Sequence, residues 1–136
     1  MPRGDADDPV ALAGEYLAAL SGTDPDLVAG LVAEDFVNEH LGALGSGCTG
    51  RDEYRRRLPG FFAALPARSY RVVDAVAERR DDHTIVVVHY RLTASVDGRD
   101  VDLGGMMWIT VRRGEIARRI DCWDGVAFLR QTGRAV

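Results

Sequence analysis

The chain has 136 residues, of which 46% are hydrophobic and 28% charged, and its net charge is −4. This length fits one domain, the composition excludes a disordered, collagen-like or coiled-coil chain, and the acidic balance disfavours nucleic acid as a partner. No apolar run reaches the ~20 residues of a membrane span, and Met1–Asp8 has no signal-peptide core, so we expect a cytoplasmic protein without a membrane partner.

Three helices are predicted in the first half of the chain. Asp8–Pro9 and Asp24–Pro25 each place a capping side chain before a proline at the first helical position. Apolar residues then recur at helical spacing after both starts. A third helix is predicted from about Arg51 to Leu65, with Pro59 expected to kink or split it.

A short extended piece at 35–39 and a glycine-rich loop at 41–50 separate the second and third helices. After the third helix the apolar pattern changes to a period of two, which is typical of strands. Four long antiparallel strands are predicted at 70–76, 84–96, 101–111 and 115–123. Helices followed by an antiparallel sheet indicate one α+β domain over residues 9–133. Residues 1–8 are expected to be a disordered N-terminal extension.

The basic and metal-ligating residues limit the chemistry. All 17 basic residues are arginine, which excludes a Schiff-base lysine and a phosphate-loop lysine. His40, His83 and His89 lack the paired spacing of a metal site. The two cysteines, Cys48 and Cys122, are far apart in sequence and are predicted to be free thiols. We therefore expect neither a metal nor a cofactor.

The strand at 84–96 separates a polar face from an apolar face. The polar face carries His89, Arg91 and Thr93, and the apolar face carries Val86, Val88, Tyr90 and Leu92. Polar groups inside a covered sheet need hydrogen-bond partners. This favours a pocket lining for the polar face, with a solvated or structurally paired face as the alternative. The apolar face could then form a homodimer interface, because three helices cover only one side of a sheet.

The last strand places Asp121 on one face with Arg119 and Trp123. Apolar neighbours raise the proton affinity of a carboxyl group, which suits acid–base work near neutral pH. An ion pair with Arg91 or Arg119 would lower the proton affinity of Asp121 and make the carboxylate structural. Whether the proton affinity is raised or lowered therefore stays open. Asp124 is predicted to cap a short terminal helix near 128–131.

Several strings resemble the nuclear transport factor 2-like superfamily, and within it the SnoaL-like, ketosteroid-isomerase-like branch. They are Tyr16–Leu20, Phe36–His40, Gly50–Asp52, Arg113–Ile116, Asp121–Asp124 and Leu129–Gly133. The resemblance covers about 9–133. It implies a cone-shaped barrel, in which a curved antiparallel sheet packs on three N-terminal helices and encloses an apolar pocket.

The same resemblance implies a cofactor-free acid–base enzyme of the cyclase or isomerase type. Its substrate would be a small hydrophobic molecule that is cyclic or bears a carbonyl group. A non-catalytic small-ligand-binding protein is the alternative, because the superfamily includes both enzymes and non-enzymes. SnoaL-like cyclases have a last-strand aspartate followed by Gln-x-Gly, which Asp121 and Gln131–Gly133 match. His40 matches a histidine at their pocket mouth.

Two other branches match less completely. Limonene-epoxide-hydrolase-like members match at Asn38, Arg91 and Asp121, but Phe36 and Thr93 replace a tyrosine and a second carboxylate. Ketosteroid isomerases match at Tyr16 and Glu39. Met106 or Met107 stands where their oxyanion-binding aspartate is needed.

The predicted site therefore has a catalytic group and a surrounding pocket. The catalytic group is Asp121, Arg91, Asn38 and His40. The pocket group is Tyr16, Phe36, Glu39, His89, Thr93, Met107, Trp108 and Trp123. Asp121 is predicted to exchange protons with the substrate, while Asn38 and His40 orient it.

Overall fold

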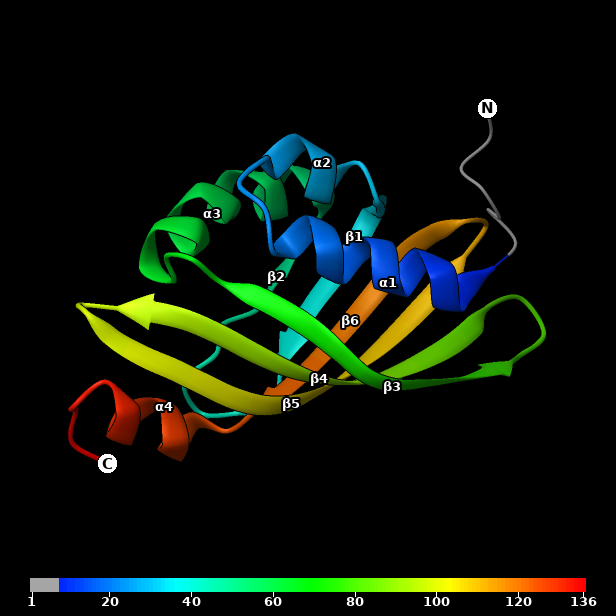
Figure 1. The fold of residues 1–136 in the computed structure, drawn as a ribbon. Coiled ribbons are helices and arrows are strands. Elements are labelled where there is room, and N and C mark those ends of the chain that lie inside the picture. Colours follow the sequence, from blue (N-terminus) through cyan, green and yellow to red (C-terminus); the bar gives the residue numbers. More distant parts are fainter. Residues whose placement is uncertain (1–7) are drawn as a thin grey trace.

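A computed structural model describes residues 8–136, so all but Asp8 of the predicted extension lies outside the described residues. The elements in chain order are α1 (Pro9–Leu20), α2 (Pro25–Ala29), β1 (Val32–His40), β2 (Cys48–Thr49), α3 (Arg51–Ala64), β3 (Ser69–Arg79), β4 (Thr84–Val96), β5 (Arg99–Arg112), β6 (Glu115–Trp123) and α4 (Gly125–Gln131). The predicted α+β fold is confirmed. Helices α1 to α3 lie on one side of a curved sheet, and α4 lies near the end of β5 (Figure 1).

The predicted helix caps are confirmed. The Asp8 carboxylate accepts a hydrogen bond from the Ala11 amide, and the Asp24 and Asp124 carboxylates cap α2 and α4 in the same way. The predicted split of the third helix is wrong, because α3 runs through Pro59 without a break. Pro59 is exposed, so water can solvate the backbone carbonyl that loses its partner to the proline.

The sheet has the strand order β2-β1-β6-β5-β4-β3. Every neighbouring pair is antiparallel except β1 and β6, which run parallel. The sequence predicts only a short extended piece where β1 forms. The register of the parallel pair sets Asn38 beside Arg119 and His40 beside Asp121. Polar residues from distant parts of the chain therefore meet on one face of the sheet.

The predicted faces of β4 are the wrong way round. Val88, Tyr90 and Leu92 are buried on the inner face, towards α1 to α3, whereas His89 and Thr93 are exposed on the outer face. Apolar residues pack against the helices because burying them gains more free energy than burying polar ones. The predicted homodimer interface on this apolar face is therefore wrong, since that face belongs to the core.

A homodimer remains a prediction, now with the outer face of the sheet as its interface. Val76 is 62% exposed, Met106 46% and Trp108 42%. Val76 and Trp108 both lie opposite Val87 in the register, so the three form one apolar row across the strands. An exposed apolar row on a sheet favours association. Sedimentation at micromolar concentration should show a dimer that Trp108→Glu dissociates, and a wild-type monomer would contradict the prediction.

Arg68 joins the C-terminal ends of α1 and α3. Its guanidinium donates to the backbone oxygens of Leu20 at 2.6 Å, Phe62 at 3.2 Å and Leu65 at 3.1 Å, and to that of Gly22. It also lies 3.9 Å from the centre of the Phe62 ring. The side chain is 5% exposed, so these carbonyls depend on it for hydrogen bonding.

Replacing Arg68 with methionine should lower the free energy of unfolding by about 2–3 kcal/mol, because the apolar stem is kept while charged hydrogen bonds to carbonyls are lost. Urea denaturation measures the change. Arg71→Met, on the exposed part of β3, is the matched control and should change stability by about 0.5 kcal/mol or less. Equal stability of the two variants would contradict the prediction.

Candidate active site

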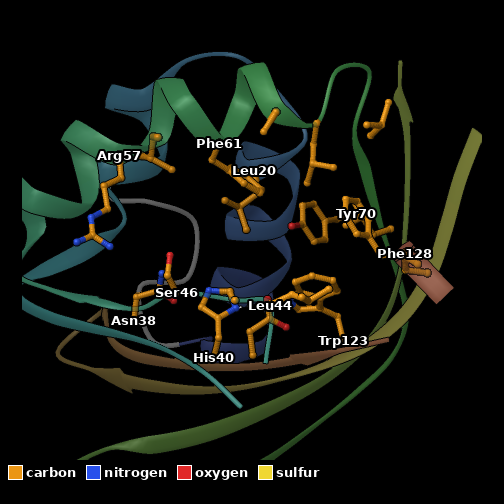
Figure 2. A pocket seen from close by; sticks show the side chains of 18 of the residues that line it. Leu20, Asn38, His40, Leu44, Ser46, Arg57, Phe61, Tyr70, Trp123 and Phe128 are labelled. Atoms are coloured by element: carbon orange, nitrogen blue, oxygen red, sulfur yellow. Dashed lines mark hydrogen bonds between the residues drawn. The ribbon is translucent and has the colours of Figure 1, made fainter. Parts of the chain in front are cut away.

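A cavity of about 760 Å³ lies between α3 and the inner face of the sheet. Its wall includes many apolar side chains, among them Leu58, Phe61, Leu92 and Leu103. The loop between β1 and β2 and the helix α4 also contribute residues to the wall. This volume is in the range of pockets that hold small molecules. Figure 2 shows Asn38 and His40 reaching into the cavity, with Trp123 close to His40.

Asp121 lies in the cavity wall and is held at both carboxylate oxygens. Tyr90 Oη donates to Oδ1 at 2.6 Å, and Arg119 Nη2 donates to Oδ2 at 2.6 Å. Asp121 is 2% exposed and Arg119 is 4% exposed. A short bond from a guanidinium identifies a charged pair. Each carboxylate oxygen retains a free lone pair, so Asp121 can still accept from a ligand.

Gly105 allows Tyr90 to reach Asp121. Tyr90 is on β4 and Asp121 is on β6, so the tyrosine side chain must cross β5. Gly105 of β5 lies directly opposite Tyr90 in the register, and a Cβ at this glycine would overlap the tyrosine ring and hydroxyl. The absence of a side chain at Gly105 therefore lets the ring lie across the strand.

A chain of hydroxyl groups continues from the other side of Arg119. Arg119 Nη1 donates to Tyr16 Oη at 3.1 Å, and Tyr16 Oη lies 2.5 Å from Tyr54 Oη. Tyr16 comes from α1 and Tyr54 from α3. The ring of Phe36 packs 4.7 Å from that of Tyr54. Burial raises the pKa of Tyr54 well above its ordinary value, so its hydroxyl stays protonated at neutral pH.

Asn38 and His40 project from β1 into the same cavity. Asn38 is 8% exposed, and its side-chain oxygen has no hydrogen-bond partner among the described residues. Trp123 Nε1 donates to His40 Nδ1 at 3.4 Å, which leaves Nε2 as the protonated nitrogen of the neutral ring. Burial and the charge of Arg119 lower the pKa of His40, partly opposed by Asp121. His40 is therefore neutral at neutral pH, and its Nε2–H group can donate to a ligand.

Residues 13–119 match the family model of the SnoaL-like domain. The chain belongs to the SnoaL-like domain family. The predicted superfamily and branch are thereby confirmed. No curated protein is significantly similar to this SnoaL-like domain in sequence.

Solved structures share the fold at low sequence identity. A hypothetical protein from Catenulispora acidiphila with a ketosteroid isomerase-like fold, in complex with trimethylamine, has a TM-score of 0.78 at 21% identity over 91% of this chain and 93% of that one. A candidate scytalone dehydratase from Novosphingobium aromaticivorans has 0.73 at 21% over 85% and 80%. A candidate polyketide cyclase from Bacillus cereus has 0.73 at 17% over 93% and 81%. These likenesses establish the fold of the SnoaL-like domain.

The structure brings together part of the predicted site. Asn38, His40, Asp121 and Trp123 all line the cavity. Three other predicted residues, Tyr16, Phe36 and Met107, are fully buried on the inner side of the SnoaL-like domain but are not part of the cavity wall. Tyr16 still takes part in the site, because it hydrogen-bonds to two residues of the wall.

Five predicted residues do not lie in the pocket, and their predicted placement is wrong. They are Glu39, His89, Arg91, Thr93 and Trp108. Arg91 Nε and Nη2 donate to Asp102 at 3.0 and 2.7 Å on the outer face, so Arg91 does not hold Asp121. Glu39 pairs with Arg118 on that face. On the outer face, solvent and surface ion pairs provide hydrogen-bond partners for the polar side chains among these residues.

Three hydroxyl groups of the cavity were not predicted as site groups, those of Tyr54, Tyr70 and Tyr90. Tyr90 could have been noticed, because it carries the one hydroxyl group between Val86 and Val96 on the apolar face of its strand. Tyr54 and Tyr70 have no such feature in the sequence, since tyrosine is common in cores.

Among the described residues, no group of three or more His, Cys, Asp or Glu side chains is placed to hold a metal ion. No helix of residues 8–136 is long and apolar enough to cross a membrane.

The loop between β1 and β2 contacts His40 through its backbone. A Cβ at Gly45 would overlap the His40 side chain. Leu44, Gly45 and Ser46 also line the cavity. The loop and the imidazole thus pack directly against each other in the wall.

The lowered pKa of His40 predicts a stability change with pH. Between this lowered value and the unfolded value of about 6.5, the unfolded chain binds a proton that the folded chain does not, so stability falls as the pH falls through this range. Thermal unfolding of the wild type from about pH 8 to about pH 5 should therefore lose more stability than that of His40→Gln. Parallel curves for the two proteins would contradict the lowered pKa.

Proposed function

We propose that this SnoaL-like domain is a cofactor-free acid–base enzyme that removes a proton beside the carbonyl group of a small, largely apolar substrate. The observation that carries the proposal is the buried carboxylate of Asp121 in the wall of a largely apolar cavity, fixed by Tyr90 and Arg119. Such positioning supports proton transfer, because a fixed base needs no reorganisation during the reaction.

The reaction begins with a substrate whose ring lies among the apolar side chains. Asp121 takes a proton from the carbon next to the carbonyl, and the electrons of that C–H bond form an enolate. Where a carbon–carbon double bond is conjugated with the enolate, return of the proton from Asp121 to the far carbon of that system shifts the double bond and isomerises the substrate. Where the substrate has a second carbonyl, attack of the enolate carbon on it closes a ring, and the alkoxide that forms takes the proton back from Asp121. The neutral His40 and the unpaired Asn38 oxygen supply a donor and an acceptor that orient the substrate's polar groups.

The unpaired side-chain oxygen of Asn38 favours a substrate that carries a hydrogen-bond donor. A buried oxygen without a partner costs about 1–3 kcal/mol. A substrate hydroxyl or N–H group that donates to Asn38 Oδ1 would recover this cost. To accept this hydrogen bond the side-chain amide of Asn38 would rotate slightly about χ2, a torsion that costs little energy to change.

Proton–deuterium exchange tests the proposal. The protein is incubated in deuterium oxide with α-tetralone and with cyclohexanone, and the α-protons are followed by nuclear magnetic resonance. We expect the wild type to accelerate exchange above the buffer rate, and Arg91→Ala, on the outer face, to match it within about twofold. A protein that binds neither ketone, or binds one without exchange, would contradict the proposal.

A non-catalytic ligand-binding role is the second candidate. It is favoured by the fact that both oxygens of Asp121 already accept hydrogen bonds within the protein. In that case a ketone would bind, and quench Trp123 in the cavity wall, without any exchange. Epoxide hydrolysis is not supported, because the Arg91 that the resemblance requires pairs with Asp102 away from the cavity.

A further inference from the structure

The cavity extends from the group around Asp121 along α3 to α4. Its wall includes residues of α3 between Tyr54 and Ala64, a stretch of helix about 15 Å long. Beyond Trp123 the wall is formed by α4 and the segment after it, with Phe128 and Arg134 among its residues. The proposed reaction uses only the part near Asp121. The remaining length can hold a second part of the substrate, and the side chains there indicate its chemistry.

Arg134 differs from the other arginines of the cavity wall, which are Arg57 and Arg119. Arg57 pairs with Glu53 at 2.8 Å, and Arg119 pairs with Asp121 at 2.6 Å. No carboxylate of residues 8–136 forms an ion pair with the guanidinium of Arg134. A guanidinium has five N–H donors and no acceptor. Arg134 can therefore donate charged hydrogen bonds to an anionic group of a ligand in the cavity.

The end of α4 fixes the position of Arg134. The Gly133 amide donates to the Arg130 carbonyl at 3.2 Å, and the Arg134 amide donates to the Leu129 carbonyl at 2.8 Å. Gly133 has a φ of 72°, a left-handed conformation that suits glycine. This pair of bonds turns the chain back beside the helix. The guanidinium of Arg134 then lies 5.4 Å from the centre of the Phe128 ring, which favours a cation at this place.

Arg99 brings a second positive charge to this end of the cavity. It lies on the same face of β5 as the buried Val101. A Cβ at Gly133 would be 2.8 Å from Arg99 Cζ, so this guanidinium packs on the residue before Arg134. Asp97 is the one acidic residue of the cavity wall at this end, and neither arginine forms an ion pair with it among the described residues. Two cations and one anion leave this end of the cavity positive.

We propose that Arg134, supported by Arg99, binds a carboxylate group of the substrate, so that the substrate is a keto acid. This inference rests on the proposed function, which places the carbonyl group near Asp121. A planar guanidinium matches the two oxygens of a carboxylate. A doubly charged phosphate fits less well, because Asp97 in the same part of the wall repels it more strongly than a single charge. Arg134 is then a residue that determines specificity.

Two aromatic rings separate Arg134 from the catalytic group. Trp123 Nε1 lies 3.4 Å from His40 Nδ1. The ring centres of Trp123 and Phe128 are 5.8 Å apart, and Arg134 follows on the other side of Phe128. A substrate that reaches both ends must pass the two rings with an apolar segment. The carbonyl and carboxylate groups of the substrate are therefore separated by a chain or ring system rather than by one or two bonds.

The test measures binding by isothermal titration calorimetry and needs no turnover. The probes are the ω-benzoyl derivatives of propionate, pentanoate and heptanoate, each compared with its uncharged methyl ester. We expect the pentanoate or the heptanoate to bind about fivefold or more tightly than its ester at low ionic strength. The propionate should show the smallest preference, because its chain is too short to pass both rings. Added salt should reduce the preference, since it screens exposed charges.

Arg134→Gln should abolish the preference for the acid and keep the affinity for the ester within about twofold. Arg99→Gln should remove a smaller part of the preference. Arg130→Gln is the matched control, because Arg130 lies on the same helix and is also exposed but is not part of the cavity wall. It removes the same charge and should keep the preference. Equal losses in Arg130→Gln and Arg134→Gln, or a full preference in Arg134→Gln, would overturn the assignment.

The binding data separate this inference from the proposed function. If no acid binds more tightly than its ester while the protein accelerates α-proton exchange of α-tetralone, the carboxylate site is wrong and the proposed function stands. If the preference depends on Arg134 but exchange does not exceed the buffer rate, the proposed reaction fails and the carboxylate site stands. Absence of binding for the acids, the esters and α-tetralone overturns both.

Discussion

Replacing Asp121 with asparagine should lower the rate of α-proton exchange by about 100-fold or more. The amide has nearly the same shape as the carboxylate, so the cavity keeps its form, but the amide cannot take the proton. Asp102→Asn is the matched control, because Asp102 also pairs with an arginine but lies on the outer face. Its exchange rate should stay at the wild-type value.

The stability of the Asp121 variant must be measured with its activity. The amide leaves Arg119 buried without a negative partner, so some loss of stability accompanies the loss of exchange. Circular dichroism and urea unfolding show whether the assay is made on folded protein. A folded Asp121→Asn variant that exchanges α-protons at the wild-type rate would show that the carboxylate is structural.

Replacing Arg119 with methionine should lower the free energy of unfolding by about 3–5 kcal/mol. The reason is that the carboxylate of Asp121, 2% exposed, would keep its charge without the cation that compensates it. The double variant Arg119→Met/Asp121→Leu removes both charges and should recover a large part of this loss, because an apolar pair of similar volume has no charge to desolvate. Urea denaturation of both variants measures the difference.

The surface pair Arg91–Asp102 provides the control for this second prediction. It has the same residue types, but the Asp102 side chain is 62% exposed. Exposed ion pairs contribute about 0–1 kcal/mol, so Arg91→Met should change stability only slightly. If Arg119→Met and Arg91→Met had equal effects, burial would not be what makes the inner pair important.

Local patterns in the sequence were enough to predict most of the elements. The capped starts at Asp8 and Asp24 and the alternation along β4 and β6 are encoded within a few residues, and the structure confirms them. The parallel pairing of β1 with β6 was not predictable in this way. It joins residues about 80 positions apart along the chain, and no local signal encodes a pairing at that distance. The position of His40 beside Asp121 follows from that pairing.

Only part of the site was predicted from the sequence, because a polar residue on a strand can face either the cavity or the solvent. Asp121 was found because a carboxylate among apolar residues is unusual. The predicted position of Arg91 was wrong because alternation along a strand separates two faces without showing which one faces the helices, and Arg91 is paired with Asp102 on the outer face. The partner of Asp121 is instead Arg119, two residues away on the same strand, which the sequence left open as an alternative.

The contact between Gly45 and His40 has a consequence for changing the specificity of this protein. Any side chain introduced at position 45 would displace the imidazole, so a substitution in the loop there also changes the cavity wall at His40. Leu44 is 47% exposed and lines the same cavity, so it can be varied without that penalty. A mutant library for new ligands should therefore randomise Leu44 and keep Gly45, because this part of the cavity wall can be reshaped only where it does not pack against the imidazole.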